Sequence, residues 1–509
     1  MKATPKNIFI TSIFFLFTIY SVHSQSGSLD LTFGVGGKVI APIGSSNDNG
    51  LGIVIQPDGK ILVAGSSDNG SGFYWFAVTR HNNDGSMDTT FDYDGKVTTG
   101  ISATSVAKSI ALQSDGKIVA GGTTTNGLGS DYAITRYNID GSLDTSFDFD
   151  GKVTADFSTS DVGYSLKIQN DNKIVIAGNT FSFGENYPTI IRYLNNGALD
   201  TTFEADGIVS VFVPGFTTQI ASLEIQSDGK LIVGGLSDNG TQYDFAVLRF
   251  NINGSLDSTF DSDGIVTTSF GSSGNSSGKS ITIQSDNKIL LAGSVYDGTN
   301  YDYAIARYNT DGSLDTTFAT TGLLTFGVGL TNDAPQDVKV QNDGKIIVAG
   351  SSYIGGFNDF SMARLNSDGS FDNSFDSDGM VTTGFGLEDN AFGIAIQSDG
   401  KIILAGNSEN GSDTDFALAR YNFLPVNIIE NYFTNSIGIF PNPSNGKFAI
   451  DDSNLKEKIK TIKIYSILGE IILNQIYTNE INLSESPKGI YFIELATEQN
   501  IYTTKIIFQ

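Results

Sequence analysis

Short apolar runs, separated by turn-forming residues at regular intervals, fill the chain from residue 29 to residue 422. In one kind of run apolar and polar residues alternate, as in Leu166-Lys167-Ile168 and Leu223-Glu224-Ile225. A period of two is typical of a β-strand with one buried face. The other kind, such as Ile346-Ile347-Val348-Ala349, is apolar throughout and predicts a strand that is covered on both faces.

The two kinds of run are joined by Asp-Gly, as in Gln113-Ser114-Asp115-Gly116-Lys117. Asp-Gly between strand-forming runs predicts a β-hairpin with a type I′ turn, in which both central residues have positive φ. Asn172 and Asn287 replace the glycine in two copies, and asparagine also tolerates positive φ. The block returns every 56 to 58 residues, at Gln56, Gln113, Gln169, Gln226, Gln284, Gln341 and Gln397. Seven copies at one period predict a repeat protein.

Each unit holds four strand candidates, which in the second unit are residues 107–113, 117–122, 131–137 and 152–155. Four-stranded units repeated radially are the blades of a β-propeller. The array opens with a fourth-strand block (residues 37–40) and stops after a third strand (residues 416–422), so the N-terminal strand can complete the last blade and cover its edge. We therefore predict an all-β fold, a seven-bladed β-propeller closed by the N-terminal strand and followed by a small β-sandwich. The alternative for the repeats is an open β-solenoid.

Two charged residues return in every unit, an arginine on the third strand and an aspartate in an Asp-x-Thr/Ser-Phe block. An active site needs its groups once, so we expect residues present seven times to serve the blade. We predict a partly buried, bidentate ion pair between them, with separate surface charges as the alternative. The arginines are Arg80, Arg136, Arg192, Arg249, Arg307, Arg364 and Arg420, and the aspartates are Asp30, Asp88, Asp144, Asp200, Asp257, Asp315 and Asp372.

The combined pattern is Gln-x-Asp-Gly-Lys-Ile-x-x-Ala-Gly followed by Arg-Tyr-Asn-x-Asp-Gly-Ser-Leu-Asp-x-x-Phe. It resembles the delta-60 repeat family of secreted bacterial proteins, and all seven units from Leu29 to Asn422 carry it. The resemblance implies a propeller-like extracellular protein without an assured activity.

After Asn422 the repeat ends. We interpret residues 423–435 as a linker and residues 436–509, with about seven short strands, as an antiparallel sandwich. Pro441-Asn442-Pro443, Gly489-Ile490-Tyr491 and Lys505-Ile506-Ile507 closely resemble the type A C-terminal sorting domain of the type IX secretion system in Bacteroidota. The resemblance implies that the type IX machinery is a partner, that this domain is removed after export, and that the protein is released or attached at the cell surface.

The first 24 residues predict a signal peptide, because Lys2 and Lys6 precede an apolar run over residues 8–22 and small residues precede Gln25. A membrane anchor is the alternative, but the run of about 15 residues is shorter than the ~20 that span a bilayer. The mature propeller then covers residues 25–422. No later stretch is long enough to span, so we predict no transmembrane segment in the mature chain.

The composition of the chain argues against several classes of partner and metal site. The formal net charge of −26 repels phosphate backbones and argues against nucleic acid as a partner. The chain has no cysteine, which excludes disulfides and thiolate metal sites. Asp-x-Asp-Gly sequences such as residues 92–95 could supply oxygen ligands to structural calcium, but Asp and Gly are also ordinary turn residues. We predict no metal site and no cofactor, with structural calcium as the alternative.

Departures from the repeat point to a ligand. Five positions before the arginine, five units have aspartate, whereas two have Trp75 and Tyr187. Exposed aromatic residues can stack on a sugar or anchor a partner, so Trp75, its neighbour Tyr74, and Tyr187 are candidate binding residues, with edge packing as the alternative. One central position of the first strand also varies and would set the character of a channel if that strand is innermost: Val54, Ala111, Lys167, Glu224, Thr282, Lys339 and Ala395.

The sequence offers few residues that could carry out catalysis. His81 is the single histidine outside the first 24 residues, and it occupies a position that is Tyr, Phe or Leu in the other units. We therefore expect a secreted or cell-surface binding module without catalytic residues, whose ligand is a glycan or a protein. The alternatives are a polysaccharide hydrolase or lyase with acidic residues at the channel, and a calcium-stabilised structural or adhesin component.

Overall fold

The computed structural model describes residues 26–127, 129–213, 217–271, 274–423, 438–452, 457–466, 471–497 and 501–508. The chain divides into two compact units, Met1–Pro425 and Val426–Gln509. The predicted signal peptide and nearly all of the predicted linker lie outside the described residues. All regular structure in the described residues is β-strand, and none of it is a helix that could cross a membrane.

The first unit consists of seven four-stranded antiparallel blades. The first strands are β2 (Asp48–Ile55), β6 (Thr104–Leu112), β10 (Ser160–Ile168), β14 (Thr218–Ile225), β18 (Ser276–Ile283), β22 (Asp333–Val340) and β26 (Asp389–Ile396). The second strands are β3 (Ile61–Asp68), β7 (Ile118–Thr125), β11 (Ile174–Ser182), β15 (Leu231–Asp238), β19 (Ile289–Tyr296), β23 (Ile346–Ile354) and β27 (Ile402–Glu409).

The third and fourth strands complete the blades. The third strands are β4 (Tyr74–His81), β8 (Ser130–Tyr137), β12 (Glu185–Tyr193), β16 (Tyr243–Phe250), β20 (Tyr301–Tyr308), β24 (Phe357–Leu365) and β28 (Thr414–Tyr421). The fourth strands are β5 (Lys96–Thr99), β9 (Lys152–Ala155), β13 (Ile208–Ser210), β17 (Ile265–Thr268), β21 (Leu323–Phe326), β25 (Met380–Thr383) and β1 (Lys38–Ala41). We number the blades 1 to 7 from β2, so that blade 7 combines β26, β27 and β28 with β1.

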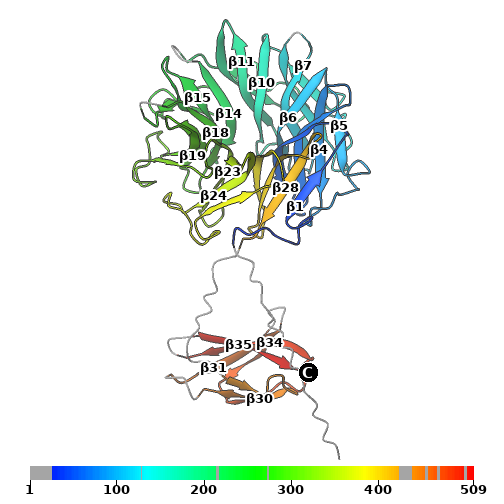
Figure 1. The fold of residues 1–509 in the computed structure, drawn as a ribbon, viewed down its shortest axis with the longest axis vertical. Coiled ribbons are helices and arrows are strands. Elements are labelled where there is room, and N and C mark those ends of the chain that lie inside the picture. The colour runs from blue at the N-terminus through cyan, green and yellow to red at the C-terminus, as the bar shows by residue number, and fades with distance from the viewer. Residues whose placement is uncertain are drawn as a thin grey trace, which may run out of the picture. The chain divides into compact units, whose positions relative to one another are not determined.

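The ring is closed by the N-terminal strand, as predicted. β1 pairs with β28 in antiparallel register from Lys38 opposite Ala419 to Ala41 opposite Phe416, and Figure 1 shows the two strands side by side. The loop that precedes β1 is also shared between the two ends of the repeat array, because Gly27 N donates to Asn422 O (3.1 Å) and Asn422 N donates to Ser28 O (2.8 Å). In the other blades one continuous loop makes the same two bonds, for example between Asn138 and residues 141 and 142.

Seven apolar cores fill the junctions between neighbouring blades, including the junction of blade 7 with blade 1. There Phe33, Ile61, Ile403 and Phe416 are fully buried together. Both faces of each second strand pack on neighbouring blades, which explains why the sequences of these strands are apolar. β3, for example, is buried at every residue but its last. The closing junction is therefore packed like the other six.

The hairpins between first and second strands form where predicted, but the predicted turn type is wrong. Only the glycine has positive φ (84° at Gly116), and Asp115 does not. Gly116 N donates to Gln113 O at 2.9 Å, and Gln113 N donates to Lys117 O at 2.9 Å. The loop thus has three residues rather than two, and is a type I turn followed by one left-handed residue. Asn172 and Asn287 adopt the same left-handed conformation at φ 63° and 64°.

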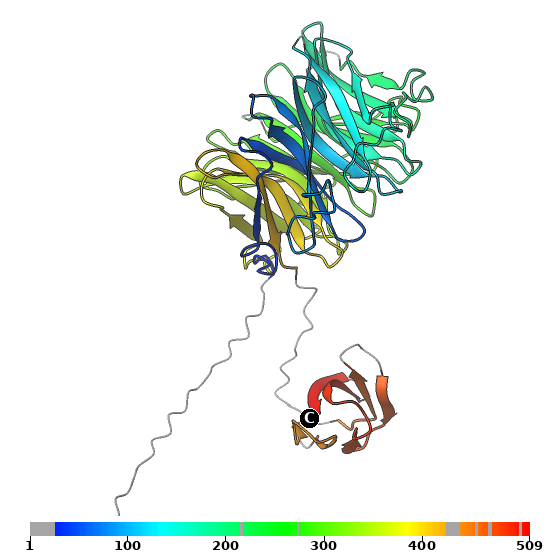
Figure 2. The ribbon, with the colours of Figure 1, turned by 90° about the vertical axis from the view of Figure 1, so that its right-hand side faces the viewer.

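The second unit is a small β-sandwich with its own core. One sheet has the order β29 (Gly438–Phe440), β30 (Lys447–Asp451), β33 (Glu480–Asn482). The other has the order β32 (Ile471–Ile476), β31 (Thr461–Ser466), β34 (Gly489–Ala496), β35 (Ile501–Phe508). Ile462, Ile464, Leu495 and Ile506 are buried between the sheets, which Figure 2 draws in orange to red.

Candidate functional site

Every first strand contains a β-bulge at the same place. The register with the second strand shifts by one residue in all seven blades, for example between Ala107 and Ser109. The glycine of the recurring Ala-Gly or Gly-Gly pair in the second strand accommodates this bulge. A Cβ on Gly122 would lie 2.0 Å from Val106 O, and the equivalent glycines are equally crowded by the carbonyl that precedes the bulge. A bulge re-aims one side chain, so the repeat presents one extra residue per blade.

The extra residues line a central cavity of about 490 Å³ to which all seven first strands contribute. Unlike the hairpins, arginines and aspartates, these residues vary between the blades. They are Leu51, Lys108, Tyr164, Ala221, Lys279, Gln336 and Phe392, and we call them the bulge ring. Each member is partly exposed, while the residue before it is buried. The repeat therefore holds side chains of six different types at seven equivalent positions around one cavity.

Two members of the bulge ring, Lys108 and Lys279, carry positive charges without an acidic partner among the described residues. Lys108 Nζ lies 3.9 Å above the centre of the Tyr164 ring. Burial lowers the pKa of Lys108 to about 8, and it also lowers the pKa of Lys279. The two lysines belong to blades 2 and 5.

A second group of charged residues in the cavity is paired. Lys167 Nζ donates to Glu224 Oε1 between blades 3 and 4, and Lys339 Nζ lies 2.8 Å from Asp337 Oδ1 within blade 6. Burial alone would lower the pKa of Lys339, but Asp337 and Glu224 outweigh this effect and raise it. With four lysines and two acids, the cavity carries a net positive charge in a chain of net charge −26.

The variable first-strand residues predicted from the sequence lie in part at this cavity. Val54, Ala111, Lys167, Glu224 and Lys339 line it, whereas Thr282 and Ala395 are buried. Lys167 and Glu224 also line a hollow of about 720 Å³ between the hairpins of blades 3 and 4. A similar hollow of about 620 Å³ lies between blades 1 and 2 and, like the first, is lined by the recurring Lys and Arg. We therefore attribute these outer hollows to the repeat.

The recurring arginine and aspartate are in contact in all seven blades. In blade 4, Arg249 Nε donates to Asp257 Oδ2 at 2.7 Å, and Lys230 Nζ lies 2.9 Å from the same oxygen. Asp257 Oδ1 accepts from Thr259 N (3.1 Å) and Oγ1 (2.7 Å). The guanidinium stacks 4.6 Å above the Phe260 ring. The predicted bidentate fork is wrong, because a hydroxyl residue occupies the oxygen that the second hydrogen bond would need.

The same arginine also joins its blade to the next. Arg249 Nη1 donates to Thr310 O of blade 5, and five other blades make the equivalent bond from Arg80 to Ile139, Arg136 to Asn195, Arg192 to Ile252, Arg307 to Ser367 and Arg420 to Asn83. Arg364 is the exception, and its buried Nη1 has no hydrogen-bond partner among the described residues. The reason is that the repeat ends just past β28, and the Phe423 ring lies 5.6 Å from this guanidinium.

The aromatic binding candidates are not brought together. Trp75 and Tyr74 lie on β4 in blade 1 and Tyr187 on β12 in blade 3, and none of them lines the central cavity. Trp75 covers Gly100, where a Cβ would meet its indole at 3.1 Å, and Tyr187 packs on Phe212 with ring centres 5.7 Å apart. Each ring therefore packs on the segment after the fourth strand of its own blade. A role in binding stays a prediction for these three residues.

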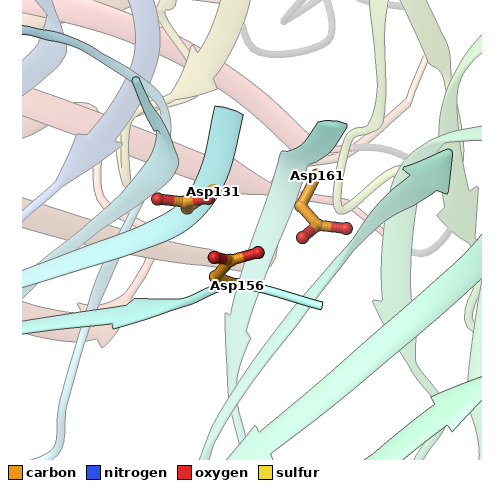
Figure 3. Close-up of side chains that lie close together, drawn as sticks. All are labelled: Asp131, Asp156 and Asp161. Atoms are coloured by element: carbon orange, nitrogen blue, oxygen red, sulfur yellow. The ribbon is translucent and has the colours of Figure 1, made fainter. Parts of the chain in front are cut away.

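In the other five blades, the position of Trp75 and Tyr187 is an aspartate at a blade junction. Asp131 occupies it in blade 2, and its carboxylate lies beside Asp156 and Asp161, with oxygens within 4.8 Å of one another (Figure 3). Burial raises the pKa of Asp131 and of Asp161, and the neighbouring carboxylates raise both further. Similar neighbours are Asp415 and Asp48, Asp302 and Asp333, and Asp359 and Asp389. In the blades that follow Trp75 and Tyr187, the position equivalent to Asp161 is Ser105 and Thr218. The two aromatic residues therefore occur where the neighbouring blade offers no aspartate at this position.

The Asp-x-Asp-Gly sequences form turns. Asp92 and Tyr93 have φ of 45° and 68°, and Asp94 Oδ1 accepts from Lys96 N at 2.9 Å. Among the described residues, the cluster of Figure 3 is the one group of three acidic ligands close enough for a metal ion. His81 is fully buried between Thr79 Oγ1 (3.0 Å) and Gly85 O (3.2 Å), and burial lowers its pKa to about 4.

Family models identify both units. Residues 56–91, 113–147, 169–203, 226–260, 284–318, 341–375 and 397–422 match the β-propeller domain of unknown function DUF5122. The repeats belong to the DUF5122 β-propeller family. Residues 438–509 match the secretion-system C-terminal sorting domain. The DUF5122 propeller thus carries a domain that points to export through the type IX secretion system.

Solved structures resemble the DUF5122 propeller in fold alone. A polysaccharide lyase, Uly1, is 12% identical with a TM-score of 0.45 and covers 80% of this chain and 94% of its own. A catalytically inactive virginiamycin B lyase from Staphylococcus aureus with quinupristin is 13% identical with a TM-score of 0.41, covering 75% and 98%. A protein of unknown function from Dyadobacter fermentans is 9% identical with a TM-score of 0.41, covering 76% and 98%. No curated protein matches the chain.

Proposed function

We propose that this protein is an extracellular or cell-surface binding module without catalytic residues, and that its ligand enters the central cavity of the propeller. A signal peptide over residues 1–24 would lead the chain out of the cytoplasm. The type IX machinery of a Bacteroidota cell would then recognise the sorting domain, whose removal leaves the propeller from Gln25 onward released or attached at the surface.

The observation that carries the binding proposal is the bulge ring. Where the architecture needs a residue, the seven blades repeat it, as with the arginines and the crowded glycines. At the bulge the backbone repeats and the side chain does not. Constant backbone geometry with varied, partly exposed chemistry is what a ligand pocket requires, since a few polar groups set among apolar ones orient the ligand.

The two acids of the cavity favour binding over hydrolysis. Glu224 is paired with Lys167 and Asp337 with Lys339, and Asp337 Oδ1 also accepts from Ser280 Oγ at 2.7 Å. Each carboxylate is therefore held by a lysine of the protein, whereas a catalytic acid or base must reach the ligand. The ligand class that we propose is a glycan or a protein segment that reaches into the channel.

The proposal is tested by filling the cavity. The exported protein should be screened on a glycan array and by pulldown, beside the variant Ala221→Trp, which places a large side chain in the bulge ring. We expect Ala221→Trp to abolish binding and to leave the melting temperature unchanged. The matched control is Ala205→Tyr, at an exposed loop position where blades 1 and 2 carry the exposed Tyr93 and Phe149. Equal binding by the two variants would disprove a ligand site in the channel.

A further inference from the structure

We infer that the central cavity selects an anionic ligand, specifically a sugar unit with a carboxylate, held between the ammonium groups of Lys108 and Lys279 and the ring faces of Tyr164 and Phe392. This inference rests on the proposed channel site and names its ligand class.

The first argument is charge. Lys108 and Lys279 are partly buried, and neither has an acidic partner among the residues described. An ammonium that is removed from water without a counter-charge destabilises the fold. The acids of the chain outnumber its basic residues by 56 to 30, yet none of the described acids forms an ion pair with these two lysines, although Lys167 and Lys339 in the same cavity each have one. A bound carboxylate would supply the missing charge.

The second argument is the surroundings of the two ammonium groups. The other members of the bulge ring are Leu51, Tyr164, Ala221, Gln336 and Phe392, so five of seven are uncharged and three are aromatic or branched aliphatic. Aromatic faces stack on the C–H faces of a sugar ring, and the Gln336 amide can bond hydroxyls. Inorganic anions would use the lysines alone. A ring with an attached carboxylate uses both kinds of group.

The third argument is the burial of the lysines. Burial lowers the pKa of both ammonium groups, which fits cations that have lost water and gained no counter-ion. The cavity of about 490 Å³ is in the range of small-ligand pockets.

Thermal unfolding with simple sugars tests the inference directly, because a ligand that binds the native state raises the melting temperature. The probes are galacturonate and galactose, which differ in one carboxylate, at equal concentration and ionic strength. We expect galacturonate to raise the melting temperature of the whole mature chain by several degrees and galactose to have little effect. The double variant Lys108→Met with Lys279→Met should lose this shift, and Lys108→Arg with Lys279→Arg should retain most of it.

The outcomes separate the ligand class from the site. Equal shifts by galacturonate and galactose, both lost in Ala221→Trp, would overturn the anionic class and leave the channel site standing. A galacturonate shift that survives in Ala221→Trp would overturn both. No shift by galacturonate in the unaltered chain would overturn the inference. Shifts by sulfate or acetate as large as that of galacturonate would show that the lysines accept any anion, which contradicts the role of the aromatic rings.

Discussion

Single residues in this propeller divide into those that the blades repeat and those that they do not. Arg249 shows what repetition means physically. Its guanidinium satisfies Asp257 in its own blade, stacks on Phe260, and donates to a carbonyl of the next blade. Burial would raise the pKa of Asp257, but Lys230, Thr259 and Arg249 together hold it well below the ordinary range. One side chain thus stabilises a loop and a blade junction at the same time.

Arg249→Met should destabilise the propeller by about 3–5 kcal/mol, because it removes a charged donor from the buried carboxylate of Asp257 and leaves the Thr310 carbonyl without its bond from Arg249. Denaturant unfolding monitored by fluorescence or circular dichroism measures the loss. Arg364→Met is the matched control. Arg364 makes the same ion pair with its aspartate and the same stacking on its phenylalanine ring, but its Nη1 has no hydrogen bond to the next blade among the described residues. Arg364→Met should cost clearly less. A loss for Arg364→Met equal to or above that for Arg249→Met would contradict the role of the bond between blades.

The raised pKa of Asp131 gives a prediction with a defined sign. Its native pKa lies above the ordinary value of 3.8, so the folded state binds more protons than the unfolded state, and stability falls as the pH rises through the native pKa. Asp131→Asn removes the charge and should raise the melting temperature at pH 7, with a gain that shrinks below about pH 4. Melting curves across pH 3–8 measure the effect.

Asp244→Asn is the control for this prediction, because Asp244 occupies the equivalent position but faces Ser276 in the next blade and accepts from Asn239 and Gln242. We expect no gain there. Structural calcium at the cluster would give the opposite pattern. Asp131→Asn would then lower the melting temperature, and a chelator would lower that of the unaltered chain.

At the scale of the strand, the bulge and its facing glycine form one device. The bulge turns a side chain into the cavity, and the carbonyl before it approaches the second strand so closely that only glycine fits. Gly293→Ala would place a Cβ 2.0 Å from Ser277 O and should cost on the order of 3 kcal/mol. It should also displace Lys279 and weaken ligand binding.

Gly344→Ala serves as the comparison, since the hairpin glycine has φ of 84° but no atom within 4 Å of its Cβ. Its cost is that of left-handed backbone alone, about 1–2 kcal/mol, and Gly344→Asn should cost less because Asn172 and Asn287 occupy this position in other blades. Denaturant titration ranks the three variants. A smaller loss for Gly293→Ala than for Gly344→Ala would contradict the account of the bulge.

Some features of these strands could be predicted from the sequence and others could not. The four strands of each unit, the hairpin positions and the pairing of the N-terminal strand with β28 follow from local patterns and were predicted. The bulge was missed because one extra residue leaves composition unchanged and its glycine resembles any other. Its signal is the position between Ala107 and Ser109, where six residue types occur in the seven units. The bond from Arg249 to Thr310 could not be predicted, since it ends on a backbone carbonyl and leaves no side-chain signature.

At the scale of the whole molecule, closure depends on a segment about 380 residues distant in sequence from its partner strand. The N-terminal segment supplies β1, Phe33 of the closing core and Asp30 for Arg420. A chain without cysteine makes this closure easy to test.

The double variant Ile40→Cys with Ala417→Cys should form an intramolecular disulfide, because these residues are directly opposite in the antiparallel pair. The oxidised form should gain about 2–4 kcal/mol over the reduced form, since the crosslink closes a very long loop. Thiol titration and non-reducing electrophoresis detect the bond. Free thiols or intermolecular dimers in place of the bond would contradict a ring latched by β1.

The central claim is that the residues which the blades do not repeat bind a ligand inside the ring. The most direct measurement is a crystal structure of the mature chain with an oligomer of galacturonate. We predict density in the central cavity, with a carboxylate within hydrogen-bond distance of Lys108 or Lys279 and a sugar ring against Tyr164 or Phe392. Density confined to the outer surface at Trp75, or a cavity that holds only water at saturating ligand, would contradict the account.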